Sequence, residues 1–343
     1  MKGRQIALDH LNGIEAAALL VDGRLDDILI APPAGTPTVG TIYAARADRP
    51  VKGQGGIFVS TPDGQGFLRG TKGIAQGARI LVQVTGHAED GKAIPVTAKL
   101  LFKSRYAIVT PSAQGLNISR QIRDEEERVR LKTILHDVAG DAPYGVILRS
   151  ASFGADDDDI AEDIAAMLTA ADTVLASEVE APAVLLQGDQ PHLLAWREWT
   201  EPAEVAQQSG SFEDCNVLDQ LDGLTNIDVR FAQITMFIEP TRALVAVDVN
   251  TGADTSPASG LKANLWAAKE LARQLRLRGL GGQITIDFAP MTKADRRQVE
   301  GALRQAFKSD PIETSLVGWT PLGHFEIQRK RERLPLNVLL GDS

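Results

Sequence analysis

The chain has 343 residues, of which 43% are hydrophobic and 24% charged. This balance excludes a chain that is disordered throughout, and the length predicts several compact domains. The formal net charge of −9 at pH 7 argues against a protein that coats nucleic acid by bulk attraction, because phosphate binding needs clustered Lys and Arg.

Cellular context follows from the cysteines and the apolar runs. Cys215 is the only cysteine, so an internal disulfide is impossible and a cysteine-based zinc site within one chain is not expected. The opening MKGRQIALDH lacks the apolar run of a signal peptide, and no apolar stretch reaches the roughly 18 residues of a spanning helix. We therefore expect a cytoplasmic protein with no membrane span.

The first third of the chain has the pattern of short strands. Residues 4–33 contain apolar runs broken at Asn12-Gly13 and Asp22-Gly23, which are turn signals. Five brief β-like runs then follow between Pro37 and about Lys99: VGTIYAA, GGIFVS, GQGFLRG, ARILVQV and AIPVTAKL. Five short strands in about sixty residues predict a small OB-type barrel.

Barrels of this type bind single-stranded nucleic acid by stacking bases on exposed aromatic rings beside basic side chains. Phe58 and Phe67 are the candidates, with Lys92 nearby in the sequence. The alternative is that both phenylalanines belong to the barrel core, since most Phe side chains are buried.

The middle of the chain predicts a mixed α+β region. Residues 105–111 and 144–150 resemble strands, while 125–138 and 156–177 have helical periodicity. The acidic run Asp156 to Asp159 suits a first helical turn, where it complements the helix dipole, better than a metal site. From Val184 to about Leu224 the pattern returns to strand-like pieces, VLLQG and LLAWREW.

Two aspartates stand out in the last third. Residues 243–250, ALVAVDVN, predict a buried strand with Asp248 and Asn250 on one face. A predicted helix follows, with one apolar face and with Gly279, Gly281 and Gly282 at its end. The next strand, QITIDF, ends with Asp287.

A strand, a helix and a strand in this order form a crossover unit, so both strands are expected to be parallel and adjacent. Asp248 and Asp287 would then lie at one sheet edge, where two carboxylates repel unless a cation or proton lies between them. Magnesium is the natural occupant, because it prefers oxygen ligands. The alternative is that each aspartate only caps its strand end.

Basic side chains accompany these strands, and two interpretations stay open for them. Arg273, Arg276 and Arg278 on the predicted helix, and the closing run EIQRKRER, either meet phosphates or form solvated faces.

The amino-acid sequence of this region resembles that of the ribonuclease E/G family. The segments that carry the resemblance are IEPTRALVAVDVNTG, NLWAAKELARQLRLRGLGGQITIDFAPM and GHFEIQRKR, with weaker likeness in GIEAAALLVDG, SRYAIVTPSAQGLNISRQI and GVILRS. The resemblance implies an α+β, multi-domain fold: a split RNase H-like domain, an inserted OB-type RNA-binding barrel, a 5′-sensor region and a DNase I-like α/β catalytic domain.

The expected domains can be assigned to residue ranges. They are 1–36 for the first RNase H-like segment, 37–98 for the barrel, 99–182 for the sensor region, 183–224 for a shortened second RNase H-like segment, 225–335 for the catalytic domain and 336–343 for a tail.

The resemblance also implies roles for single residues. Asp248 and Asp287 match the metal-binding aspartates, and Asn250 matches the amide that helps to hold them and the attacking water. Phe58, Phe67 and Lys92 match RNA-contacting positions of the barrel. Arg149 matches an arginine that binds a 5′-monophosphate, and Ser150, Ile108 and Ser104 match its pocket, with Ser150 in place of the usual threonine, Ile108 of a valine and Ser104 of a glycine.

Some positions depart from the family pattern. In the family, the loop after the first aspartate is typically basic, whereas here it reads TGADTSPASG. The family's second acid on the next strand is replaced by Pro290, and an expected arginine is replaced by Pro321. The C-P-x-C segment through which subunits share zinc does not follow EIQRKRER. We therefore expect no zinc, and any homodimer would form without a shared zinc.

The sequence thus predicts a magnesium-dependent endoribonuclease, with Mn²⁺ as a possible substitute, that cleaves single-stranded RNA in rRNA or mRNA processing or decay and leaves 5′-phosphate products. A non-catalytic RNA-binding paralogue is the alternative. A weaker alternative is a phosphatase or nucleotide hydrolase that uses the same metal pair.

Overall fold

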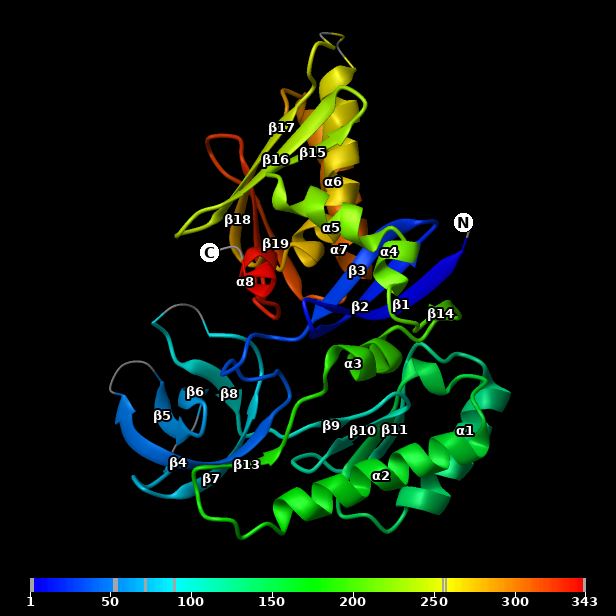
Figure 1. Cartoon of the computed structure of the whole chain (residues 1–343), viewed down its shortest axis with the longest axis vertical. Coiled ribbons are helices and arrows are strands. Elements are labelled where there is room, and N and C mark those ends of the chain that lie inside the picture. The colour runs from blue at the N-terminus through cyan, green and yellow to red at the C-terminus, as the bar shows by residue number, and fades with distance from the viewer. Residues whose placement is uncertain are drawn as a thin grey trace. The chain divides into compact units, whose positions relative to one another are not determined.

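The computed structural model describes residues 3–51, 55–70, 73–88, 91–254, 256 and 258–341. The chain divides into two compact units (Figure 1). Unit 1 combines Met1–Ile30 with Glu204–Ser343, and unit 2 spans Ala31–Ala203. Among the described residues, no helix has both the length and the apolar character that a membrane crossing requires.

Unit 1 begins with a four-stranded sheet in the order β14-β1-β2-β3. Its strands are β1 (Arg4–Leu11), β2 (Ile14–Val21), β3 (Arg24–Ile30) and β14 (Glu204–Ala206). The first three are antiparallel, and the turns at Asn12-Gly13 and Asp22-Gly23 have positive φ at both residues, as two-residue hairpins require. The predicted strands and turns of this segment are therefore confirmed.

Helices cover this sheet through apolar side chains. α4 (Ser211–Asp214), α5 (Val217–Thr225) and the short α8 (Leu336–Leu340) contribute Phe212, Leu221 and Leu336 to one core with Leu20 and Leu25 of the sheet. The first thirty residues therefore pack against segments that come some two hundred residues later.

The second sheet of unit 1 has six strands in the order β15-β16-β17-β18-β20-β19. They are β15 (Asp228–Phe231), β16 (Ile234–Pro240), β17 (Val245–Asn250), β18 (Gly282–Asp287), β19 (Thr314–Trp319) and β20 (Phe325–Arg329). Only β17 and β18 form a parallel pair, and the other neighbours are antiparallel. The predicted crossover is thereby confirmed.

Two long helices, α6 (Ser259–Leu277) and α7 (Lys293–Ser309), pack together and against this sheet (Figure 1). In β17, Val245, Val247 and Val249 enter the shared core, whereas Asp248 and Asn250 are exposed. Because side chains alternate along a strand, the buried valines leave the polar residues on the face away from the helices.

Unit 2 contains a closed five-stranded barrel, as the sequence predicts. Its strands are β4 (Ile42–Val51), β5 (Gly56–Thr61), β6 (Gly64–Arg69), β7 (Arg79–Val84) and β8 (Ile94–Thr97). Neighbours pair in the order β4-β5-β6-β8-β7, and β7 returns to β4 and closes the barrel. β13 (Ala183–Leu186) adds to the outer edge of β4. This arrangement is consistent with an OB-type domain.

The rest of unit 2 is the predicted α+β region. A sheet in the order β11-β12-β10-β9 packs against α1 (Glu125–Ala139) and α2 (Asp157–Leu175). Its strands are β9 (Phe102–Lys103), β10 (Ala107–Thr110), β11 (Leu116–Ile118) and β12 (Gly145–Leu148). Asp156 caps α2 and accepts a hydrogen bond from the Asp158 N–H, which confirms the capping interpretation of the acidic run.

One predicted element is wrong. LLAWREW was expected to be strand-like, but it lies in the helix α3 (Pro191–Glu198). Pro191 occupies the first helical turn, where its missing N–H costs nothing, and Ala195 faces inward while Leu193 and Trp196 remain exposed. A short apolar run does not distinguish a strand from a helix by its periodicity alone.

Candidate active site

Asp248 and Asp287 lie directly opposite each other on the parallel strands β17 and β18. Both side chains are exposed on the sheet face away from the helices. Neighbouring strands are about 4.8 Å apart, so the two carboxylates lie side by side. The sequence predicts this juxtaposition from alternation and the crossover alone.

Asn250 orients the first aspartate. Its Nδ2 donates a hydrogen bond of 2.7 Å to Oδ2 of Asp248. The bond uses one oxygen of Asp248, so its Oδ1 and the side-chain Oδ1 of Asn250 are further acceptor atoms that this bond does not occupy. Asp248, Asn250 and Asp287 are thus brought together as expected.

A hollow of about 300 Å³ surrounds the two aspartates. Its walls are mainly apolar and come from neighbouring strands of the sheet: Phe237, Glu239, Leu244, Ala246, Val247, Asp248, Thr285, Asp287 and His324. Such a hollow excludes part of the solvent, which strengthens electrostatic interactions within it.

Two titratable members of this hollow, His324 and Glu239, were not identified from the sequence. His324 places Nε2 3.8 Å from Oδ2 of Asp287, and Glu239 lies on β16 beside the acid pair. The register of β18 with β20, Ile286 opposite Phe325, brings His324 next to Asp287. That pairing is non-local, so no local pattern signals it. The sequence does offer one signal for His324, because this residue lies in GHFEIQRKR, a segment that carries the family resemblance.

The donor atoms of the site suit a hard divalent cation. Within the described residues of the chain, no group of three or more His, Cys, Asp or Glu side chains is placed to hold a metal ion. Asp248 and Asp287 therefore offer two carboxylates, and Asn250 adds one amide. The other positions around an ion would be filled by water or substrate. Magnesium binds in this way, through one or two carboxylates with retained waters.

The predicted RNA-contacting phenylalanines lie side by side on the barrel. Phe58 on β5 is directly opposite Phe67 on β6, with ring centroids 5.2 Å apart. Both rings are half-buried, so they neither fill the core nor project freely. A Cβ added to Gly56 would come within 2.6 Å of the Phe67 ring, so this glycine leaves room for it. Lys92 is exposed just before β8, which pairs with β6.

The predicted sensor residues surround an ion cluster. Arg149 follows β12 and donates to the carbonyl oxygens of Ser104 and Arg197 and to Oε2 of Glu198, the last at 2.8 Å. Ser104 is buried and its hydroxyl is bonded to Asp163. Ile108 is half-buried on β10, and Ser150 is exposed at the start of a 3₁₀ turn, Ser150–Ser152.

Glu198 is the centre of this cluster. Lys103 lies 2.7 Å and Arg197 2.8 Å from its Oε1, in addition to Arg149 at Oε2. Burial would raise the pKa of Glu198, but the three cations outweigh burial and lower that pKa to about 2. The carboxylate therefore stays charged and occupies Arg149.

Arg273 and Arg276 lie on α6 and Arg278 caps its end. For Arg276 and Arg278, both predicted interpretations, phosphate contact and a solvated face, are wrong. Arg276 and Arg278 are buried, and neither forms a solvated face nor is free for phosphate. Arg276 pairs with Asp26, Asp27 and Asp310, and Arg278 donates to the carbonyl oxygens of Leu224 and Asn226. Arg273 pairs with Glu270.

The closing basic run also contains structural residues. Arg329 is fully buried and lies 2.8 Å from Asp310, while Arg333 pairs with Asp27. Arg329 and Arg333 therefore join with Arg276 in binding Asp310 and Asp27, which links the strand β3 to α6 and to the C-terminal segment.

A sheet that presents two acids and an amide, in a chain with a closed five-stranded barrel, fits an enzyme that acts on nucleic acid. The model of the ribonuclease E/G family matches residues 102–203 and 196–332. The chain belongs to this family, and its class is therefore that of an endoribonuclease.

Known relatives extend the match over most of the chain. This chain is 28% identical to ribonuclease G of Salmonella typhimurium (strain SL1344), over 92% of this chain and 77% of that protein. It is 27% identical to ribonuclease G of Escherichia coli (strain K12), over 94% and 79%. With ribonuclease E of Nostoc sp. (strain PCC 7120) it shares 26% identity over 96% of this chain, but only 56% of that longer protein.

Proposed function

We propose that this chain is a magnesium-dependent endoribonuclease that cleaves single-stranded RNA and leaves 5′-phosphate products. The observation that carries the proposal is the register of Asp248 with Asp287, in a chain that belongs to a ribonuclease family. The hydrogen bond from Asn250 to Asp248 supports it, because it fixes the orientation of one carboxylate.

Asp248 and Asp287 would hold the ion between them, and their mutual repulsion favours a divalent cation at that point. Mn²⁺ would also fit these oxygen ligands, and zinc is not expected. The bound ion would supply an activated water and neutralise charge that develops on the phosphate.

The other residues of the hollow would position the reacting groups. Asn250 holds Asp248 in one rotamer, and His324 and Glu239 provide polar contacts for an attacking water or a leaving oxygen. Release of the 3′-oxygen would leave the phosphate on the downstream fragment, which gives the 5′-phosphate product. Phe58, Phe67 and Lys92 would bind the RNA chain on the barrel by stacking and charge.

The sensor role of Arg149 belongs to the same proposal. A 5′-monophosphate would have to compete with the Glu198 carboxylate for this guanidinium, because the two are paired at 2.8 Å. We therefore expect Ser104, Ile108 and Ser150 to form a pocket that responds only weakly to the 5′ end. The finer architecture, with its RNase H-like and DNase I-like domains, also stays a prediction.

Cleavage of a 5′-monophosphorylated single-stranded RNA, with and without Mg²⁺, tests the proposal. Asp248→Asn and Asp287→Asn should each lower kcat by roughly 10² to 10³-fold, as is typical when a group that stabilises transition-state charge is removed. Asn250→Ala should cost about 10 to 100-fold, as for residues that orient a metal ligand. Asp222→Asn, at an exposed position of α5 in the same unit, is the matched control and should leave kcat unchanged.

Cleavage that persists in Asp248→Asn would rule out the metal pair. Tight RNA binding without any Mg²⁺-dependent product from the wild-type chain would instead support the RNA-binding paralogue. Hydrolysis of a mononucleotide but not of RNA would support the phosphatase.

A further inference from the structure

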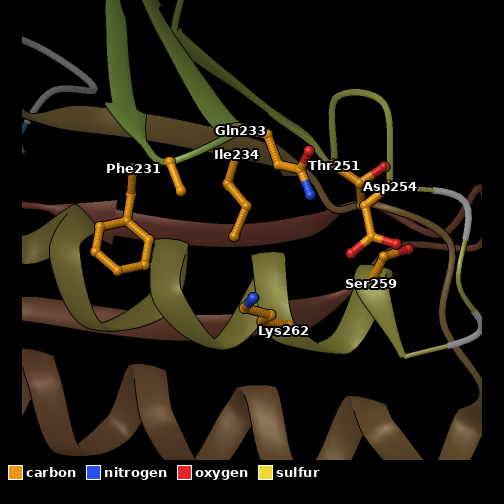
Figure 2. A pocket seen from close by; sticks show the side chains of 8 residues that line it. Phe231, Gln233, Ile234, Thr251, Asp254, Ser259 and Lys262 are labelled. Carbon is orange, nitrogen blue, oxygen red and sulfur yellow. The ribbon is translucent and has the colours of Figure 1, made fainter.

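A second hollow, of about 200 Å³, lies in unit 1 just beyond the end of β17 (Figure 2). It is formed by the β15–β16 turn, by Thr251 and Asp254 after β17, and by the first turns of α6. Its lining residues are Phe231, Ala232, Gln233, Ile234, Thr251, Asp254, Ser259 and Lys262. It includes none of the residues assigned above to metal binding or catalysis.

Phe231 forms one wall of this hollow and is half exposed. Its side chain is 52% exposed, although burying a phenylalanine is worth about 1.5–3 kcal/mol. The ring stacks on Trp266 of α6, with centroids 5.8 Å apart and planes 14° apart. Trp266 packs in turn against the core of the sheet. The stacking on Trp266 therefore supports one face of the exposed Phe231 ring.

The backbone also fixes this wall. Phe231 and Ile234 are paired across a two-residue turn, and Ala232 in that turn has a φ of 54°, in the left-handed region. A rigid aromatic ring that leaves one face to solvent is the feature by which proteins stack on nucleobases.

The hollow lies close in sequence to the candidate active site, at the end of β17 that carries Asp248 and Asn250. Thr251 directly follows Asn250, and Asn250 is paired with Thr235, the neighbour of Ile234. The hollow lies on the helix side of the sheet and the acid pair on the other face, so a strand of RNA that contacts both must pass around the end of β17.

The charges of the hollow favour a neutral occupant. Figure 2 shows Phe231 on one side and Asp254 with Ser259 on the other, while Lys262 rises from α6 between them. Hydrogen bonds from Ser256 lower the pKa of Asp254, so this carboxylate stays charged and balances Lys262. A free anion would meet both charges and gain little, whereas a flat, uncharged ring finds an aromatic wall and the polar groups of Gln233 and Thr251, and holds the phosphate attached to it beside Lys262.

We propose that one nucleobase of single-stranded RNA stacks on Phe231 in this hollow, and that Lys262 contacts the adjacent phosphate. Phe231 then acts as a positioning residue that sets which phosphodiester lies at Asp248 and Asp287. This inference depends on the proposed function for its substrate, but the binding of the base does not require cleavage.

The test uses the full-length protein in EDTA, so that no cleavage occurs. The probe is a set of single-stranded RNA oligonucleotides that carry 2-aminopurine at one position each. Besides any quenching at Phe58 and Phe67 of the barrel, which substitution of Phe231 should not change, we expect one further position to be quenched by the wild type and by Phe231→Tyr, which keeps the ring. Phe231→Leu, which keeps an apolar contact with Trp266, should lose the quenching and raise Kd about 5- to 100-fold.

Two further variants keep the test independent of folding defects. Lys262→Gln, at an exposed position of α6, should raise Kd and lower the slope of log Kd against log salt by about one. Val317→Ala, at a 65% exposed apolar residue on β19 of the same sheet, is the control and should bind like the wild type.

The outcomes separate the two proposals. Quenching and Kd that are unchanged in both Phe231→Leu and Lys262→Gln would overturn this inference, even if the wild type cleaves RNA with Mg²⁺. Loss of quenching in Phe231→Leu, with no cleavage by the wild type under any divalent ion, would support the inference and overturn the proposed nuclease.

Discussion

Glu198 shows how single charged residues shape this protein. Three cations surround it, and it is the only residue paired with Arg149, Arg197 and Lys103 together among the described residues of the chain. The same carboxylate therefore holds α3 against β9 and β12 and keeps the predicted sensor arginine occupied. A residue that the sequence analysis did not identify thus determines which contacts the predicted sensor residue Arg149 makes.

The stability that Glu198 provides should depend on pH. Its pKa in the folded chain, about 2, lies below the ordinary value of 4.5, so its contribution is complete above about pH 4.5 and is lost as the pH falls toward 2. Since the side chain is 31% exposed, we expect Glu198→Gln to cost about 1–3 kcal/mol at pH 7. Urea unfolding at pH 7 and at pH 3 measures this.

The control for that measurement is Glu178→Gln, at an exposed position of the same unit, which should unfold like the wild type at both pH values. A Glu198→Gln cost that is as large at pH 3 as at pH 7 would contradict the ion-pair explanation and indicate a loss of packing instead.

At the candidate site, local patterns predicted what strand alternation and one crossover determine. Asp248, Asn250 and Asp287 were found in this way, because their shared face depends on residues within forty positions of one another. His324 and Glu239 were missed, since their place beside the acids depends on the antiparallel neighbours of β17 and β18. The burial of Arg276 and Arg329 was missed for a related reason: the acids that surround them, Asp310 and Asp27, come from separate segments of the chain.

At the scale of elements, the end of α6 shows how one glycine determines a helix boundary. The N–H of Leu280 bonds to the carbonyl of Leu275, and that of Gly279 bonds to Arg276, which together form a Schellman motif. Gly279 has a φ of 64°, and a Cβ there would lie 1.9 Å from the carbonyl oxygen of Leu334. The sequence predicted this helix end, but not the close approach of residue 334.

Gly279→Ala should therefore lower the free energy of unfolding by about 2–4 kcal/mol, because it combines an unfavourable φ with a backbone clash. Gly301→Ala is a matched comparison within α7, where an added Cβ meets nothing within 4 Å. It should raise that free energy by about 0.5–1 kcal/mol. Thermal unfolding of both variants measures the difference, and equal effects would contradict this account of Gly279.

At the scale of the whole molecule, unit 1 is assembled from two distant segments. Leu20, Leu25 and Ile28 share a core with α5 and with Leu277 of α6. The pairs of Asp27 with Arg276 and Arg333 join the same segments through charge. The strands and turns of residues 4–30 were predictable from local signals, but their partners were not, because nothing local in residues 204–343 records this pairing.

This arrangement predicts how fragments behave. Residues 31–203 alone should unfold cooperatively on heating and bind single-stranded RNA without cleaving it, since Asp248 and Asp287 lie in unit 1. Residues 204–343 alone should not fold, because the core with β2 and β3 is missing, but should fold when 1–30 are joined to them by a flexible linker. Circular dichroism and resistance to proteolysis measure both, and a stably folded 204–343 fragment would contradict the prediction.

The split of unit 1 also has a consequence for the order of events during synthesis. The first three strands leave the ribosome well before their helical partners exist, and the whole of residues 31–203 is made in between. At ordinary rates of translation this interval lasts roughly 10–35 s, long enough for unit 2 to fold first. We therefore expect the apolar side chains of residues 4–30 to stay without their partners in residues 204–343 during that time, which exposes them to aggregation or to chaperones.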